Sequence, residues 1–269
     1  MRASDALDRA ALARHLAAAV REAGALALKS FKVPDKSWFK SGNSPVSDAD
    51  IAVDALLRQR LEAAGLACGW LSEETEDDPA RLTARQVWIV DPIDGTRAFL
   101  AGLPDWSISV ALTEAGRPIL AAIFAPVAGD LYLASAGGGA TCNDRPMMAS
   151  ADAALAGARV AGPKRYIDGL SAIEPTLVPV PKVHSLALRL ARIAEGTFDV
   201  AIAGGSSHDW DLAAADLLVH EAGGALTSFG GGTVTYNRPV PRHGMLVAAG
   251  RDRHAALIEL FRDERLASL

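Results

Sequence analysis

Two aspartates three residues apart are the clearest candidates for chemistry in this sequence. Asp91 and Asp94 follow the apolar run WIV directly, without a spacer. Pro92 between them fixes its own φ and has no N–H for a strand ladder, so we expect the strand to end there. Both carboxylates and the carbonyl of Ile93 can then point the same way, and oxygen ligands of this kind suit Mg²⁺. An ordinary Asp-Pro turn is the alternative.

The residues after these aspartates are suited to binding a phosphate. Gly95 permits a tight turn, and Thr96 can cap a short helix over RAFLAG. Backbone N–H groups at a helix start can hold a phosphate oxygen. The alternative is that Thr96 only caps the helix.

A second acidic stretch, SEETEDD, follows the apolar residues LACGWL. Glu73 can therefore lie at the end of a strand, where it could share a metal ion with the two aspartates. Runs of acidic residues are usually solvated. We accordingly expect the last three acids of the stretch to face solvent: Glu76, Asp77 and Asp78.

A third group of acids lies in HDWDLAAAD. Asp209 or Asp211 can cap the helix that follows, and a carboxylate at that position could instead face a cation. Trp210 is expected to pack, and Asp216, inside the helix, to be structural.

The remaining polar candidates are less specific. The stretch SPVSDAD places Asp48 and Asp50 at the start of a helix, a short distance after Lys40. His184 and His208 are interpreted as hydrogen-bonded structural groups, because the histidines show no zinc-binding spacing.

These residues need a framework of interleaved helices and strands. Helical spacing is found in residues 6–29, 49–65, 185–196, 209–224 and 251–266, and strand-like runs in 87–90, 106–126, 129–143, 157–162, 198–205 and 244–250. Residues 137–139, a glycine triplet, lack the Lys-Ser or Lys-Thr of a nucleotide loop and are interpreted as a hairpin. The pattern predicts a layered α/β (α+β) protein. We expect one domain over residues 1–269, with halves of about 1–150 and 151–269.

Composition limits the functional classes. The net charge of −5 and the lack of a basic stripe argue against binding a nucleic acid polymer. Cys68 and Cys142 lie far apart and are expected to be reduced thiols. No signal peptide and no run of roughly 20 apolar residues is present, so we expect a cytoplasmic protein without a membrane span.

Four stretches in chain order resemble the motifs of the inositol monophosphatase family: SPVSDAD, SEET, WIVDPIDGT and WDLAAADLLVHEAGG. Members of this family are lithium-sensitive, magnesium-dependent phosphomonoesterases. Ser72 stands where the family usually has glycine, and Ala215 and Asp216 stand where small residues are more usual. The resemblance implies an αβαβα sandwich of the sugar phosphatase type, usually a homodimer.

The resemblance also implies roles for single residues. Two or three Mg²⁺ ions would be held by Glu73, Asp91, the Ile93 carbonyl, Asp94 and Asp211. Glu73 and the Thr96–Asp50 pair would accept the proton of the attacking water. The substrate would be bound by Gly95, Thr96, Asp211, Ser185 and Lys40.

The motifs identify the phosphate but not the alcohol. Family members that act on inositol phosphate commonly carry an acidic residue at the position of Gly204, and Asp209 is the available substitute here. A substrate of the inositol 1-phosphate type is the first expectation, and a 3′(2′),5′-bisphosphate nucleotidase acting on phosphoadenosine phosphate is the alternative. Histidinol-phosphate and fructose-1,6-bisphosphate phosphatases, and a non-catalytic regulatory partner, are further alternatives.

Overall fold

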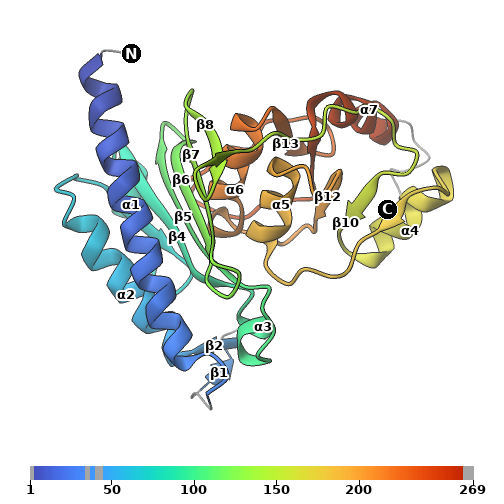
Figure 1. The fold of residues 1–269 in the computed structure, drawn as a ribbon. Helices are drawn as coiled ribbons and strands as arrows, with labels where there is room; N and C mark the ends of the chain where they lie inside the picture. The colour runs from blue at the N-terminus through green and yellow to red at the C-terminus, as the bar shows by residue number, and fades with distance from the viewer. Residues whose placement is uncertain (1–2, 34–36, 40–44, 263–269) are drawn as a thin grey trace.

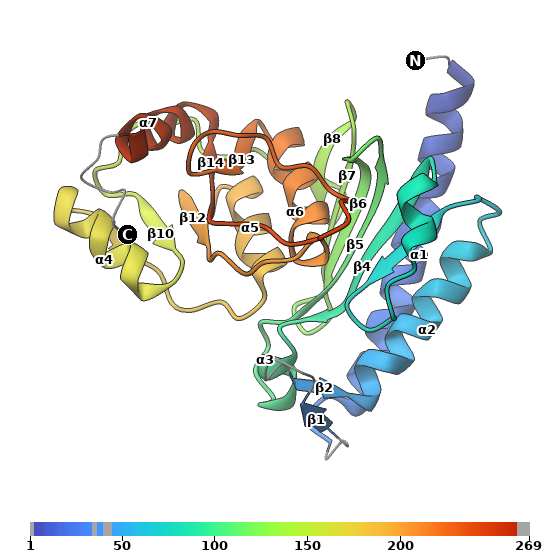
Figure 2. The ribbon, with the colours of Figure 1, turned by 180° about the vertical axis from the view of Figure 1, so that it is seen from behind.

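The chain folds into five layers, in the order helices, sheet, helices, sheet, helices (Figures 1 and 2). The structure, a computed structural model, describes residues 3–33, 37–39 and 45–262. The layers confirm the αβαβα sandwich predicted from the sequence.

The first two layers come from the N-terminal half of the chain. The helices are α1 (Ala3–Ser30) and α2 (Asp48–Glu62), and the seven-stranded sheet runs in the order β3 (Gly69–Ser72), β4 (Gln86–Asp94), β5 (Ser107–Glu114), β6 (Arg117–Ala125), β7 (Asp130–Ser135), β8 (Gly139–Cys142) and β9 (Arg145–Pro146). Shorter elements are β1 (Ser37–Phe39), β2 (Pro45–Ser47), the 3₁₀ helix η1 (Pro79–Thr83) and α3 (Thr96–Leu100).

The other three layers come from the C-terminal half. The central helices are α5 (Leu186–Ala194) and α6 (Asp209–Glu221). The five-stranded sheet runs in the order β11 (Val178–Pro179), β10 (Arg159–Ala161), β12 (Val200–Ala203), β14 (Leu246–Gly250) and β13 (Gly224–Ser228). The outer helices are α4 (Lys164–Ile173) and α7 (Arg251–Arg262).

Alternating side chains explain why each sheet is covered on both faces. In β4, Trp88 and Val90 pack with α1 and α2, whereas Val87 and Ile89 pack with α5 and α6. All four are almost fully buried. Both sides of β4 are therefore in hydrophobic cores, and the end of this strand has a fixed position.

The prediction that the strand ends at Pro92 was wrong. Strand β4 continues to Asp94, and its pairing with β5 shifts register between Asp91 and Asp94. Pro92, which has no N–H to donate, lies within this irregular stretch. Regular pairing resumes at Asp94, which lies opposite Ser107. The two aspartates thus lie on a strand within the sheet.

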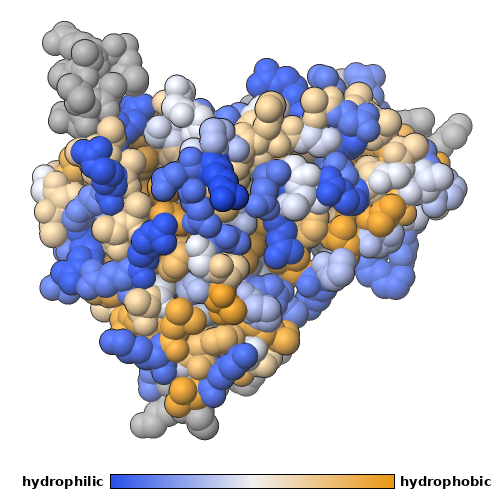
Figure 3. Space-filling view, viewed as in Figure 1, coloured by the Kyte–Doolittle hydropathy of each residue, from blue (hydrophilic) through white to orange (hydrophobic). Residues whose placement is uncertain are grey.

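An apolar region lies on the described surface near α3. Apolar residues gather at the end of the molecule where α3 lies (Figure 3). Leu100, Leu103 and Val33 are 39%, 41% and 56% exposed. A side chain at Gly102 would contact Lys32, and Phe31 packs against Phe99, so these two segments are adjacent. Within the described residues, no helix combines the length and apolar character that a membrane crossing requires.

Candidate metal centre

Three carboxylates from the two halves of the chain meet in one place. Asp91 and Asp94 lie at the end of β4, and Asp211 lies in the first turn of α6. Each offers an oxygen, and these oxygens all lie within 4.8 Å of one another. Three negative charges at such distances repel strongly unless a cation or protons neutralise them.

Asp91 shows most clearly that the residues fit a cation. Its residue is 1% exposed, and its Oδ1 has no hydrogen-bond partner. Burial raises the pKa of Asp91 well above its usual value, and the charges of Glu73, Asp94, Asp211 and Asp50 raise it further. An all-oxygen set with an unsatisfied buried oxygen is the donor chemistry that Mg²⁺ prefers.

Asp94 is held in place by the start of α5. Ser185 Oγ and Ala187 N donate to its Oδ2, each at 2.6 Å, and Leu186 N donates to its Oδ1 at 3.2 Å. Burial raises the pKa of Asp94, and these three hydrogen bonds oppose the rise. The carboxylate is therefore buried but oriented by specific donors.

Ser185 was expected to contact substrate. Its residue is fully buried, and its hydroxyl donates to Asp94 and accepts from Leu188 N at 2.9 Å. In the structure, the Ser185 hydroxyl is therefore engaged by the Asp94 carboxylate and by the backbone of α5.

Asp211 is fixed by the cap of its own helix. Its Oδ2 accepts the backbone N–H of His208 at 2.7 Å. Burial, followed by the charge of Asp94, raises the pKa of Asp211 to about 7. Trp210 packs as expected, with its ring stacked on His208 at a centroid distance of 4.5 Å.

Asp209 is unavailable to a substrate hydroxyl. It is 0% exposed, its Oδ1 accepts from His243 Nε2 at 2.7 Å, and its Oδ2 accepts from Asn237 N at 2.6 Å. The structure therefore argues against Asp209 as a substitute for an acid at Gly204.

The expected Thr96–Asp50 pair is present. Thr96 Oγ1 lies 3.4 Å from Asp50 Oδ1 and 3.1 Å from the Ile93 carbonyl oxygen. Asp50 is 1% exposed, and its Oδ2 accepts from both the hydroxyl and the backbone N–H of Ser47, which caps α2. The helix cap thus holds Asp50 toward Thr96.

Gly95 is required by both conformation and space. Its φ is +94°, and a Cβ there would lie 3.2 Å from both Asp105 O and Ser185 N. Only glycine adopts this turn without strain at such a close junction.

Glu73 lies at the end of β3, and the acidic residues that follow it lie in the next loop and make other contacts. Glu73 directly follows β3, and its backbone N donates to Val90 O at 3.2 Å, next to Asp91. It is outside the set of three oxygens that lie within 4.8 Å. Glu76, Asp77 and Asp78 are exposed, as expected; in addition, Asp77 pairs with Arg81 Nε at 2.5 Å, and Asp78 caps η1.

Two residues near the site, Asp105 and Arg81, were not singled out in the sequence analysis. Asp105 binds His184 at 2.6 Å, and Arg81 is almost fully buried. Neither residue belongs to a recognisable motif, so no sequence signal could have identified them. Lys40, expected near the substrate, lies outside the described residues.

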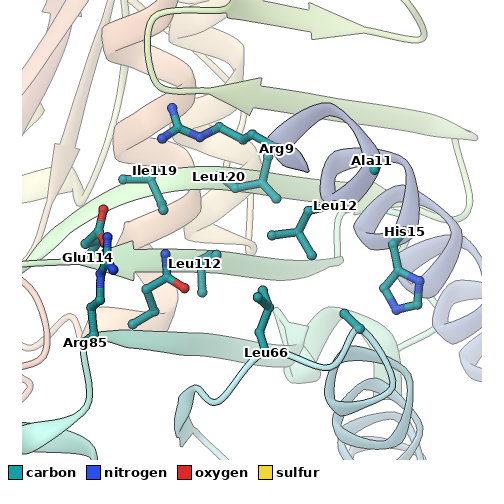
Figure 4. A pocket seen from close by; sticks show the side chains of 12 residues that line it. Arg9, Ala11, Leu12, His15, Leu66, Arg85, Leu112, Glu114, Ile119 and Leu120 are labelled. Carbon is teal, nitrogen blue, oxygen red and sulfur yellow. Dashed lines mark hydrogen bonds and ion pairs between the residues drawn. The ribbon is translucent and has the colours of Figure 1, made fainter. Parts of the chain in front are cut away.

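A cavity elsewhere in the molecule has different chemistry. A space of about 650 Å³ lies between α1 and the seven-stranded sheet. Its walls include Leu12, Leu66 and Ile119, and at one end Arg85 pairs with Glu114 at 2.7 Å (Figure 4). None of its lining residues belongs to the cluster of three aspartates. The cavity therefore does not form part of the candidate metal centre.

Comparisons with known proteins agree with this geometry. The model of the inositol monophosphatase family matches residues 7–266. The chain is 37% identical to an inositol-1-monophosphatase of Rhizobium meliloti over 70% of this chain and 73% of that protein. It is 30% identical to the Nus factor SuhB of Escherichia coli K12 over 80% and 84%. The crystal structure of the extragenic suppressor protein suhB from Bartonella henselae superposes with a TM-score of 0.84 at 27% identity, covering 94% of this chain and 99% of that one.

Proposed function

The chain belongs to the inositol monophosphatase family and is therefore a phosphatase, and we propose that it hydrolyses a small phosphorylated metabolite of the inositol 1-phosphate type with Mg²⁺. The family is metal-dependent. The observation that carries the proposal is the meeting of Asp91, Asp94 and Asp211 around an unsatisfied buried oxygen.

Three aspartates would hold the metal ions, together with Glu73 and the Ile93 carbonyl. Two or three Mg²⁺ ions bound there would supply the positive charge to neutralise the phosphate dianion, to activate a water and to stabilise the leaving alkoxide. The start of α5 orients Asp94 through three hydrogen bonds, and the cap of α6 orients Asp211. The chain thus supplies ligands whose positions are set before the substrate arrives.

Proton removal is assigned to the Thr96–Asp50 pair or to Glu73. The Thr96 hydroxyl lies against Asp50 Oδ1, so it can accept a proton from water as it passes its own proton to Asp50. The turn at Gly95 and Thr96 is proposed to bind the phosphate oxygens. We expect direct attack by water, with no phosphoenzyme.

A second candidate substrate is a 3′,5′-bisphosphate nucleotide such as phosphoadenosine phosphate. It is favoured by the lack of a carboxylate at Gly204 and by the engagement of both Asp209 oxygens. Family members that act on inositol phosphate commonly have an acidic residue at that position, so its absence is the reason to test the second candidate.

The substrate is identified by comparing kcat/KM for inositol 1-phosphate, phosphoadenosine phosphate, histidinol phosphate and fructose 1,6-bisphosphate, with Mg²⁺ and with added Li⁺. We expect inositol 1-phosphate to lead by about tenfold or more, a specificity that a few hydrogen bonds provide, and Li⁺ to inhibit. A lead for phosphoadenosine phosphate would replace the first candidate with the second. No turnover of any substrate would instead favour a regulatory role.

A homodimer in the cytoplasm completes the proposal. The apolar surface around α3 supports the dimer, because exposed apolar patches are typical of protein interfaces. Cys68 and Cys142 are free thiols, as is usual in a reducing compartment. Light scattering coupled to gel filtration tests the dimer, and a monomeric mass would contradict it.

A further inference from the structure

Asp105 holds a segment from the other half of the chain. It lies between α3 and β5, and its Oδ2 accepts both the backbone N–H and the ring Nδ1 of His184, each at 2.6 Å. The backbone carbonyl of Asp105 accepts from Ser185 N at 3.2 Å. The His184 and Asp105 side chains are 24% and 17% exposed. Three hydrogen bonds thus fix the two residues that precede α5.

The segment that Asp105 fixes is the one that orients Asp94. Ser185 donates to Asp94 Oδ2, and Leu186 and Ala187, the first residues of α5, donate their N–H groups to the same carboxylate. Ser107 Oγ lies 3.0 Å from Ser185 Oγ, so the β5 start supports the same hydroxyl. These three hydrogen bonds to the Asp94 side chain therefore all come from the segment just after His184.

The backbone segments at this junction are tightly packed. A Cβ at Gly95 would lie 3.2 Å from both Asp105 O and Ser185 N, so the backbones of all three segments are in close contact. A shift of residues 184 and 185 would accordingly change the direction of the Asp94 carboxylate. Metal affinity depends on such orientation, and the loss of outer partners of a ligand typically costs 10- to 100-fold.

We propose that Asp105 and His184 are positioning residues for the metal centre, which set the Asp94 carboxylate through Ser185. The inference rests on the proposed function, because it assumes that Asp94 binds Mg²⁺. Since a carboxylate only accepts, the ring of His184 must carry a hydrogen on Nδ1. If the Asp105–His184 pair only held the two halves of the chain together, its loss would lower the melting temperature and leave the Mg²⁺ affinity unaltered.

The test measures the Mg²⁺ affinity of the full chain by titration calorimetry, without substrate. The melting temperature of each variant in EDTA is measured as well. Asp105→Ala is expected to weaken Mg²⁺ binding by about 10- to 100-fold. Asp105→Asn keeps an acceptor oxygen for both donors, so it is expected to recover most of the affinity. His184→Ala removes only the ring bond and is expected to show a smaller loss, and it carries the test if Asp105→Ala does not fold.

The matched control is His220→Ala. His220 also pairs with a buried aspartate, Asp216, at 2.8 Å, but it lies at the far end of α6 from Asp211. This variant is expected to lower the melting temperature in EDTA and to bind Mg²⁺ as the wild type does.

Two results would contradict different claims. In the first, the wild type binds Mg²⁺ while Asp105→Ala and His184→Ala both bind it with an affinity within about twofold of the wild-type value. That result would overturn the positioning role and leave the proposed function standing. Wild type that binds no Mg²⁺ would overturn the proposed function, and this inference with it.

Discussion

Asp91 illustrates how a proposed metal ligand lowers the stability of the metal-free protein. It is buried, one of its oxygens has no hydrogen-bond partner, and four other acids act on it. Burying a charge without a partner is unfavourable. In the proposed function the compensating favourable free energy comes from the bound cation, so stability of the metal-free protein and function would oppose each other at this residue.

Asp91→Asn should therefore make the metal-free protein more stable. The substitution removes one of the repelling charges and keeps the size of the side chain. We expect a melting temperature in EDTA higher by about 3–6 °C, corresponding to about 1–2 kcal/mol, and the loss of phosphatase activity. An unchanged or lower melting temperature, measured by calorimetry, would show that the acids do not repel one another as the geometry implies.

Asp94→Asn should remove the charge of a proposed ligand. Its one amide oxygen can still accept from Ser185 and Ala187, but its NH₂ group cannot accept from Leu186 N. Since outer partners of a metal ligand are worth 10- to 100-fold, the ligand itself should be worth at least about 10²-fold in kcat. Steady-state kinetics at saturating Mg²⁺ measures this. A folded variant with wild-type kcat would remove Asp94 from the centre.

At the scale of single residues, the sequence indicated which side chains belong to the candidate site better than it indicated which side chains contact one another. Asp91, Asp94 and Asp211 could be chosen because carboxylates beside apolar runs are unusual. The contacts of Ser185 with Asp94 and of Asp105 with His184 join residues about 80 to 90 positions apart. Only the fold brings them together, so no local pattern could show them.

At the scale of elements, β4 and α6 carry the centre. Strand β4 is buried on both faces, and α6 packs between the two sheets, so the ends of both elements are rigid. The caps of α2 and α6 were predictable, because Ser47 and the acids near Asp211 are typical of helix starts. The continuation of β4 through Pro92 was not, because it depends on pairing with Ser107 of β5.

Helix α6 also contains a pH-dependent contact remote from the centre. The hydrogen bond to Asp216 raises the pKa of His220 above its usual value, opposed by burial and by Arg117. A raised folded-state pKa means that the contact stabilises the fold below about pH 6.5 and loses its effect as the pH rises through the folded-state pKa.

His220→Gln should accordingly destabilise the protein at pH 6 more than at pH 9. The loss at pH 6 is expected to be about 1 kcal/mol, small for a bond to a charged group because a third of the side chain is exposed. Melting temperatures of both proteins at the two pH values measure the difference. Equal losses at pH 6 and pH 9 would contradict the assignment.

At the scale of the whole molecule, a buried arginine joins the halves. Arg81 is 2% exposed, and its guanidinium binds Asp77, the Asn237 side chain and the Arg238 carbonyl. Asn237 in turn binds Asp209 in the first turn of α6. The loop after Glu73 and the helix of Asp211 are thus connected by one chain of hydrogen bonds.

Arg81→Met should lower the free energy of unfolding by roughly 3 kcal/mol, the lower end for a broken buried pair. The Asp77 side chain is 43% exposed, so water can partly replace its partner. Urea denaturation measures the change. The control is Arg85→Met, which breaks a pair whose arginine side chain is 86% exposed and should cost less than about 1 kcal/mol. Similar losses for both variants would contradict the joining role of Arg81.

The five-layer order was predictable from the sequence only through the motifs. Helical and strand periodicity indicate a layered α/β protein, and the resemblance of four motifs adds the sandwich. The sheet orders could not be predicted, because β12 and β14 pair antiparallel while β10 and β12 pair parallel, a choice set by long-range packing.

The most direct test of the metal centre is anomalous diffraction from crystals grown with Mn²⁺, as a substitute for Mg²⁺, and phosphate. The account predicts manganese peaks within ligand distance, about 2.0–2.3 Å, of oxygens from Asp91, Asp94 and Asp211, with a phosphate bound to the same ions. Manganese found only elsewhere, with these three carboxylates turned away from one another, would contradict it.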